Sequence, residues 1–336
     1  MGKYGSHSRK RRKKRSILPV VIAVSAMLLF GLLFYFIQKD QFRNPYDLIS
    51  RTDTLCYSAY TPEIAEAFAG DLSVIRKNND ADTENTAQTG LLCSDDGGDA
   101  LYAKNVFSKM NPASTTKIMT CLLALENADL DKKITVGNEI YMNEAGVSLA
   151  GLKQGDTLTM EQLLYALMLP SGADAANAIA VSISGSIDRF AALMNDRAKK
   201  IGACQTHFSN AEGLTDPGHY TTCYDMYLIL HEAVKNPEFL KIAGTSEYQA
   251  SFTSADGSEA ALKWTNTNLF LTGKAEEPSG MKAVAGKTGT TLAAGSCLAL
   301  LSKTKDNRNY YSVILKADNR ADLYSNMGDL LEKVPE

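Results

Sequence analysis

The sequence of 336 residues contains only four histidines and one tryptophan, and its six cysteines include no Cys-x-x-Cys pair. Transition metals are held mainly by closely spaced Cys and His side chains, so this scarcity predicts no metal site. The segment His231–Lys235 begins like a zinc-binding helix but lacks the second histidine of such a helix. No Gly-x-Ser-x-Gly motif is present, which leaves little support for a Ser-His-Asp triad. Neither a zinc carboxypeptidase nor a triad hydrolase is predicted.

Acidic residues are missing from positions 1–15, which carry eight lysines and arginines. The rest of the chain has 27 basic and 38 acidic residues, a net charge of −11. Nucleic-acid-binding domains need a basic face, so the acidic body predicts no nucleic-acid partner. An apolar content of 45% is ordinary for a folded protein, and the length allows one large or two ordinary domains.

Charge is also missing from residues 17–37, which directly follow the basic block. At about 1.5 Å per residue, a helix of this length spans a hydrocarbon core of roughly 30 Å. The segment is longer than a signal-peptide apolar core of about 7–15 residues, and no Ala-x-Ala pattern follows it. We therefore predict a transmembrane signal anchor at 17–37 and a basic cytoplasmic tail at 1–16. This places the protein in the cell membrane, with its folded part on the extracytoplasmic side; a cleaved signal peptide is the alternative.

Residues 38–87 are predicted to be a linker, because 76–88 offers few side chains that could bury surface. The remaining residues 88–336 are predicted to form the folded domain. Short apolar runs on both sides of Ser94–Gly98 predict a β-hairpin. Helices are predicted at 114–125, 155–170, 173–183, 188–201, 222–235 and 320–333, and strands at 284–290, 295–302 and 309–316. This order predicts an α+β fold, an antiparallel sheet with flanking helices.

Ser114 and Lys117 form a Ser-x-x-Lys pattern at the start of an apolar helical run. This spacing puts both side chains on one face of a helix, with the amine beside the hydroxyl. A serine becomes a nucleophile when a base takes its proton, and a lysine serves if burial and a second cation, such as Lys287, lower its pKa. Two further matches, Ser279–Lys282 and Ser302–Lys305, lie in a loop and a polar turn. Only Ser114 opens a buried helix, where its alternative role is an N-cap.

Lys287, Thr288, Gly289 and Thr290 lie on a predicted strand. A strand beside a cleft presents a cation and hydroxyls to a carboxylate, and glycine lets a ligand approach the backbone closely. Between this cluster and the first one stands Ser171–Ala173. The three clusters correspond to the S-x-x-K, S-x-x and K-T-G set of serine acyl-transfer enzymes. Each is weak alone, but their order and contexts together predict one site.

Longer segments around these clusters resemble one family, the serine D-alanyl-D-alanine carboxypeptidases, or low-molecular-weight penicillin-binding proteins. Asn111–Thr120 is similar to the family's active-site helix, and Leu163–Ala176 to its second motif. Asn210–Leu214 and His219–Met226 resemble a loop and helix between the second and third motifs, and Gly286–Thr290 completes the set. The resemblance covers roughly residues 88–330 and includes scaffold segments. It implies a transpeptidase-like fold with an all-helical subdomain.

The resemblance also implies roles. Ser114 attacks the carbonyl between two terminal D-alanines, Lys117 takes its proton, and Ser171 relays a proton to the leaving amine. The oxyanion hole would consist of the Ser114 and Thr290 amides. The substrate-binding residues are then Lys287, Thr288, Gly289 and Thr290, with Lys287 and a threonine on the terminal carboxylate. The implied partners are a peptidoglycan pentapeptide and β-lactams as covalent inhibitors, and no cofactor is needed.

Ala173 departs from the family pattern, which usually has Asn at this position. There the amide bonds the substrate backbone and helps to fix the catalytic lysine, whereas alanine has neither donor nor acceptor. A catalytically weak or inactive wall-binding homologue is therefore an alternative. A class A β-lactamase is a further one, but it needs a glutamate in a Glu-x-x-x-Asn-type loop. Between Ser171 and Lys287 the sequence offers no convincing candidate.

Overall fold

The structure is a computed structural model that describes residues 27, 29, 72–142, 144 and 146–335. The predicted tail 1–16, the predicted anchor 17–37 apart from Met27 and Leu29, and linker residues 38–71 lie outside this part. Among the residues described, no helix is both long and apolar enough to cross a bilayer. Residues 72–335 belong to one compact unit.

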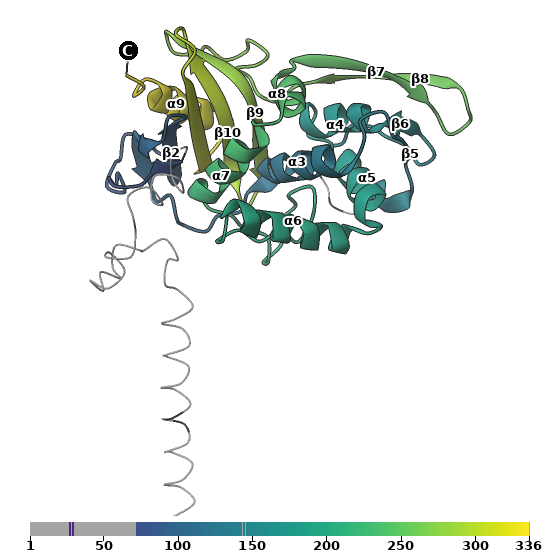
Figure 1. Cartoon of the computed structure of the whole chain (residues 1–336), viewed down its shortest axis with the longest axis horizontal. Coiled ribbons are helices and arrows are strands. Elements are labelled where there is room, and N and C mark those ends of the chain that lie inside the picture. Colours follow the sequence, from purple (N-terminus) through teal and green to yellow (C-terminus); the bar gives the residue numbers. More distant parts are fainter. Residues whose placement is uncertain (1–26, 28, 30–71, 143, 145, 336) are drawn as a thin grey trace, which may run out of the picture. The chain divides into compact units, whose positions relative to one another are not determined.

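An antiparallel five-stranded sheet forms one half of this unit (Figure 1). Its order is β4-β2-β11-β10-β9. The hairpin of β2 and β4, from the start of the unit, pairs through β2 with β11, the last strand in the sequence. β9 is an edge strand, which leaves one side of it open to neighbouring segments. The strands are β2 (Thr89–Ser94), β4 (Tyr102–Lys104), β9 (Met281–Thr291), β10 (Gly295–Thr304) and β11 (Asn309–Ala317).

Both faces of this sheet are buried, and the strand sequences show why. Successive side chains point to opposite faces, and here both sets are apolar. Leu298 and Leu300 pack in a core with α9 (Arg320–Leu331), while Ala299 and Leu301 belong to the core shared with the helices on the other face. The runs at 295–302 and 309–316 therefore read as almost continuously apolar. The predicted strands, the final helix and the α+β class are confirmed.

The second half surrounds the helix that follows Ser114 (Figure 1). A 3₁₀ turn, η1 (Ala113–Thr116), runs into α3 (Lys117–Asn127), whose residues 117–124 are all buried. Among the described residues five helices contact α3, and α7 also covers the sheet. These neighbouring elements are α4 (Met160–Met168), α5 (Ala173–Ser184), α6 (Ile187–Ile201), α7 (Cys223–Ala233) and α8 (Pro237–Gly244). A helix apolar on most sides was predicted here, and its surroundings explain that composition.

The helical half is not all-helical, contrary to the sequence-based prediction. It carries a four-stranded sheet ordered β5-β6-β7-β8, and α4 begins at Met160 because residues 157–159 form a strand. Alternate residues of the longest pair face solvent, so their apolar content is low and the strands were not predicted. Asp256-Gly257 marks their turn. The strands are β5 (Lys133–Thr135), β6 (Thr157–Thr159), β7 (Glu247–Thr253) and β8 (Glu259–Thr265).

Residues 72–87, which the sequence assigns to the linker, pack on the domain. β1 (Ser73–Val74) pairs with β3 (Gly98–Asp99), and the Ser73 amide donates to the Tyr227 hydroxyl. Asn85 and Ala87 are buried although their surroundings are polar in sequence. The Asn85 side chain donates to the Asn326 carbonyl, and Ala87 belongs to the apolar core that includes α9. The ordered fold therefore begins before the predicted boundary at residue 88.

Candidate active site

Ser114 lies in the 3₁₀ turn at the start of α3, where the chain changes direction sharply. Ala113 has a left-handed φ of 48°, an uncommon conformation for a residue with a Cβ. No side chain caps either η1 or α3, so Ser114 is not the N-cap that the sequence left as an alternative. Its side chain is partly exposed, while the residues on both sides of it are buried. The turn thus presents one hydroxyl from an otherwise buried segment.

The amine of Lys117 lies beside this hydroxyl. Its Nζ donates to Ser114 Oγ at 3.1 Å and to the main-chain carbonyl of Glu212 at 2.5 Å. The lysine is 1% exposed, although lysine is rarely buried in proteins. The arrangement is the one that the Ser-x-x-Lys spacing predicts. It gives the hydroxyl a proton acceptor if the amine is neutral.

Burial favours the neutral form of the Lys117 amine. Loss of solvation lowers the pKa of Lys117 to about 8, against the opposing effect of the carboxylates of Glu212 and Asp174, which raise it. Lys287 is the second cation that the sequence predicts near Lys117, and the two charges interact. The repulsion between the two cations is expressed at Lys287, whose pKa lies well below its usual value because of burial and the Lys117 charge. A pKa near the working pH suits a group that takes and returns a proton.

β9 passes directly beside the serine. At Gly289 an added Cβ would lie 2.8 Å from the Ser114 amide nitrogen and 3.0 Å from the Ala113 Cβ, so only glycine fits. Lys287 is buried, with its Nζ donating to the Thr288 carbonyl at 2.9 Å. The neighbouring Thr290 is exposed. The third cluster therefore lies against the first, as its chemistry requires.

Ser171 has an unusual backbone and an unused hydroxyl. Its φ of 65° is left-handed, and its Oγ is buried without a hydrogen-bond partner among the described residues. Such a group is costly unless a ligand or water satisfies it. Ser171 lies two residues before the start of α5, which packs against α3. A buried hydroxyl held in a strained conformation next to the helix that carries Lys117 is typical of a functional position.

Ala173 is 2% exposed, and its amide donates to the Ser148 carbonyl. Asn177, one turn later, donates to the Glu139 carbonyl rather than to Lys117 or Ser171. It therefore does not supply the missing amide. Asp174 binds the backbone amides of the loop at 150–152 and shapes the segment beside the second cluster.

Three further side chains near the site were not predicted as functional. Glu212 is 7% exposed, and its Oε2 has no partner among the described residues. His219 orders the loop before α7: its Nε2 bonds Thr116 Oγ1 at 2.8 Å, and burial lowers the pKa of His219 to about 4. Arg320, at the start of α9, donates to the Thr267 carbonyl, and Thr267 Oγ1 bonds Thr288 Oγ1 at 2.6 Å.

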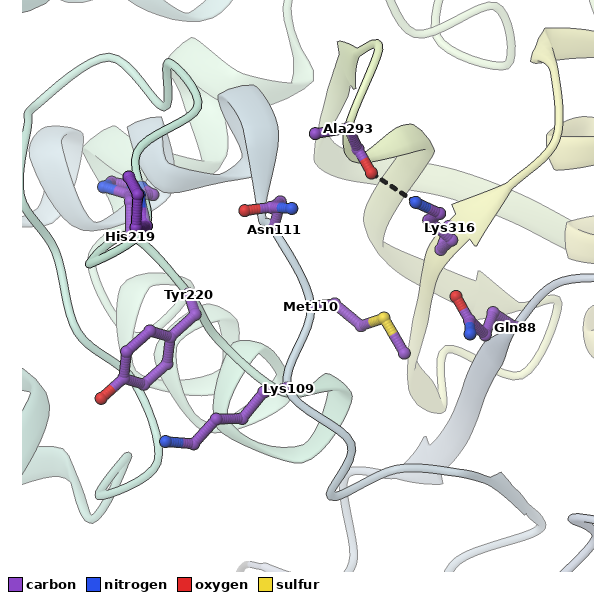
Figure 2. Close-up of a pocket in the computed structure, with 9 residues that line it drawn as sticks. Gln88, Lys109, Met110, Asn111, His219, Tyr220, Ala293 and Lys316 are labelled. Atoms are coloured by element: carbon purple, nitrogen blue, oxygen red, sulfur yellow. Dashed lines mark hydrogen bonds between the residues drawn. The ribbon is translucent and has the colours of Figure 1, made fainter.

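A pocket of about 310 Å³ lies next to this site (Figure 2). Asn111 and His219 line it, and Lys316 in its wall donates to the Ala293 carbonyl. None of the predicted catalytic or substrate-binding residues lines this pocket. Among the described residues no cluster of His, Cys, Asp and Glu could hold a metal ion.

The comparison with protein families identifies the chain. The model of the D-alanyl-D-alanine carboxypeptidase family, peptidase S11, matches residues 76–319. The chain belongs to this family. The match begins within the segment that packs as β1 and the turns after it, which agrees with the early start of the ordered fold.

Curated relatives and solved structures agree. The chain is 34% identical over 235 residues to the D-alanyl-D-alanine carboxypeptidase DacF of Bacillus subtilis, covering 69% of this chain and 57% of DacF. The D-alanyl-D-alanine carboxypeptidase of Streptomyces sp. K15 is 34% identical, covering 67% of this chain and 79% of the relative. The crystal structure of the Streptomyces K15 DD-transpeptidase matches with a TM-score of 0.68 at 31% identity, covering 74% of this chain and 96% of that one. The chain thus spans little more than half the length of DacF.

Proposed function

We propose that this protein is a membrane-anchored serine D-alanyl-D-alanine carboxypeptidase that removes the terminal D-alanine from peptidoglycan stem peptides. The observation that carries the proposal is the 3.1 Å hydrogen bond between Lys117 Nζ and Ser114 Oγ at a buried lysine whose pKa is lowered to about 8. Family membership supplies the substrate class. The uncharged segment 17–37 behind a basic block supports anchoring with the domain outside the membrane.

The geometry supports a two-step reaction. Neutral Lys117 accepts the Ser114 proton as Oγ attacks the carbonyl carbon, and the tetrahedral oxyanion is stabilised by the Ser114 and Thr290 amides. The proton passes through Ser171 to the amine of the departing D-alanine, whose carboxylate Lys287 and Thr288 or Thr290 hold. Water then attacks the acyl-enzyme, and the proton it loses returns through Lys117 as Ser114 is released. β-Lactams would acylate Ser114 in the same way.

A second outcome for the acyl-enzyme is favoured by one observation. The structurally similar Streptomyces K15 protein is described as a DD-transpeptidase. Transpeptidation is by definition transfer of the acyl group to an amine rather than to water. Ala173 removes an amide from the site, so slow hydrolysis with retained acylation is the corresponding proposal for this chain. A catalytically weak wall-binding homologue is the limiting case.

Labelling with a fluorescent penicillin tests the acyl-enzyme. We expect one covalent adduct on Ser114 of the full-length protein and none on Ser114→Ala, with Ser279→Ala as the control from an unrelated Ser-x-x-Lys match. Equal labelling of wild type and Ser114→Ala, or none on either, contradicts the proposal. Incubation with a peptide ending in D-Ala-D-Ala, with and without an added amine acceptor, then separates hydrolysis from transfer by the products formed.

A further inference from the structure

Of the carboxylates that raise the pKa of Lys117, the proposed base, Glu212 has the largest effect. The loop that carries Glu212 is fixed next to the turn of Ser114. Gly213 has φ of 92°, and a Cβ at this position would collide with the Ala113 carbonyl, so the loop lies tightly against the turn of Ser114. The Gly213 amide donates to Asn210 Oδ1 at 2.7 Å, and Thr120 Oγ1 of α3 donates to the Ala211 carbonyl at 2.6 Å. These contacts fix both sides of Glu212.

Both polar groups of Glu212 act on Lys117. The main-chain carbonyl accepts from Lys117 Nζ at 2.5 Å, which orients the amine toward the hydroxyl. The carboxylate is buried, and its Oε2 has no partner among the described residues. Burial raises the pKa of Glu212, and the Lys117 charge opposes this effect. A buried charge without a counter-charge is expensive, so each group stabilises the ionised form of the other.

The side chain at position 173 gives Lys117 neither a hydrogen bond nor a counter-charge in this chain. The methyl group of Ala173 has no donor or acceptor, and Asn177 is bonded to the Glu139 carbonyl. The other titratable groups facing the pair from neighbouring elements are Asp174 at the start of α5, Lys287 on β9, Glu144 in the loop before β6 and His219 in the loop before α7. Asp174 is bound to three backbone amides of residues 150–152, whereas the Glu212 Oε2 is unpaired.

We propose that Glu212 is the positioning residue of Lys117: its carbonyl fixes the amine beside Ser114, and its carboxylate is the counter-charge that keeps a proton available there, compensating for Ala173. The inference rests on the acyl-transfer function proposed above. Without the Glu212 charge, burial would favour the neutral form of both lysines more strongly, because Asp174 would be the remaining carboxylate that raises the pKa of Lys117. Lys117 could then accept the serine proton but would hold it too weakly to return it to the leaving amine.

The test is the pH dependence of acylation by a fluorescent penicillin, measured on the full-length protein. Glu212→Gln keeps the shape and the main-chain carbonyl but removes the negative charge that raises the Lys117 pKa, so the pKa of Lys117 should fall in this variant. The acidic limb of the rate profile should therefore move to lower pH by about one unit, because a buried charge near a titratable group shifts its pKa by that order or more. Below pH 7 this variant should acylate faster than the wild type, which a merely structural defect would not produce.

Two control variants accompany it. Glu212→Asp keeps the charge and should restore the limb toward the wild-type position, which also keeps the inference testable if Glu212→Gln folds poorly. Glu144→Gln removes an exposed carboxylate and should leave the limb within a few tenths of a unit, because solvent screens its charge. An unmoved limb in Glu212→Gln refutes the inference. So does a change confined to adduct lifetime, which would place the carboxylate on the hydrolytic water. Absence of labelling in the wild type refutes the proposed function instead.

Discussion

The close approach of β9 to the serine makes Gly289→Ala a sharp test of the site. The new Cβ would lie 2.8 Å from the Ser114 amide nitrogen and 3.0 Å from both the Ala113 Cβ and the Pro112 carbonyl. Non-bonded contacts of this kind need about 3.5 Å, so the strand and the serine turn must separate by about 0.7 Å. All three contacted groups belong to the turn that carries the nucleophile.

A displacement of this size should have a large effect on the reaction rate and a moderate effect on stability. Misplacing reacting groups by about 1 Å costs about 100-fold, and losing one oxyanion donor costs about 100- to 1,000-fold. We expect the acylation rate of Gly289→Ala to fall by about 100-fold or more. Overpacking should lower the free energy of unfolding by about 1–3 kcal/mol, which leaves a folded protein.

Gly286→Ala is the matched control on the same strand. Its Cβ would lie 2.6 Å from the Ala299 carbonyl of β10, so the overlap is at least as severe but is directed away from Ser114. The two variants should lose similar thermal stability, whereas Gly289→Ala alone should lose most acylation by fluorescent penicillin in stopped-flow or gel-based assays. Equal acylation rates in the two variants would refute the reasoning that Gly289 exists to admit the serine turn.

Three further predictions follow from the same geometry. The wild-type acylation rate should rise about fivefold between pH 7 and pH 8 and level off above pH 9, because Lys117 must be neutral to act as base and its pKa is about 8; a rate that falls over this range would exclude Lys117 as the base. Ala173→Asn should raise the rate of D-alanine release from a D-Ala-D-Ala peptide about fivefold by restoring one hydrogen bond to the substrate, and a slower or unchanged variant would mean that the site is arranged differently. Arg320→Gln should raise KM for that peptide about 3- to 10-fold, with little change in kcat, because it removes a cation linked through Thr267 to Thr288; an effect on kcat alone would argue against a role in carboxylate binding.

Much of the fold could be predicted because local pattern and tertiary burial agree. The strands at 295–302 and 309–316 are apolar on both faces, and the helix after Ser114 is apolar all around, so each pattern indicates an element enclosed by others. The strands at 247–253 and 259–265 escaped prediction for the opposite reason. Their outward residues are charged or polar, and their inward residues are few, so no continuous apolar signal exists.

The site was predictable wherever chemistry depends on spacing along the chain. The separation of Ser114 and Lys117 by three residues already determines that their side chains meet on a helix. Glu212 could not be found in this way, because its effect depends on a loop that folds back 95 residues after Lys117. The available signal was a glutamate directly before a glycine in the Asn210–Leu214 segment, where a surface charge is the ordinary interpretation.

Ala173 and Glu212 together change how the departure from the family pattern is understood. An alanine in place of an amide leaves the amine of Lys117 with one fewer partner, and an unheld lysine would drift from Ser114 or lose its proton permanently. In this chain the Lys117 amine donates to the main-chain carbonyl of Glu212 at 2.5 Å. The buried carboxylate of Glu212 raises the pKa of Lys117, against the effect of burial. The two functions that one amide combines, holding the lysine and contacting the substrate, are thereby separated. Only the second is left unfilled, so the substitution should weaken peptide turnover more than it weakens acylation by a penicillin.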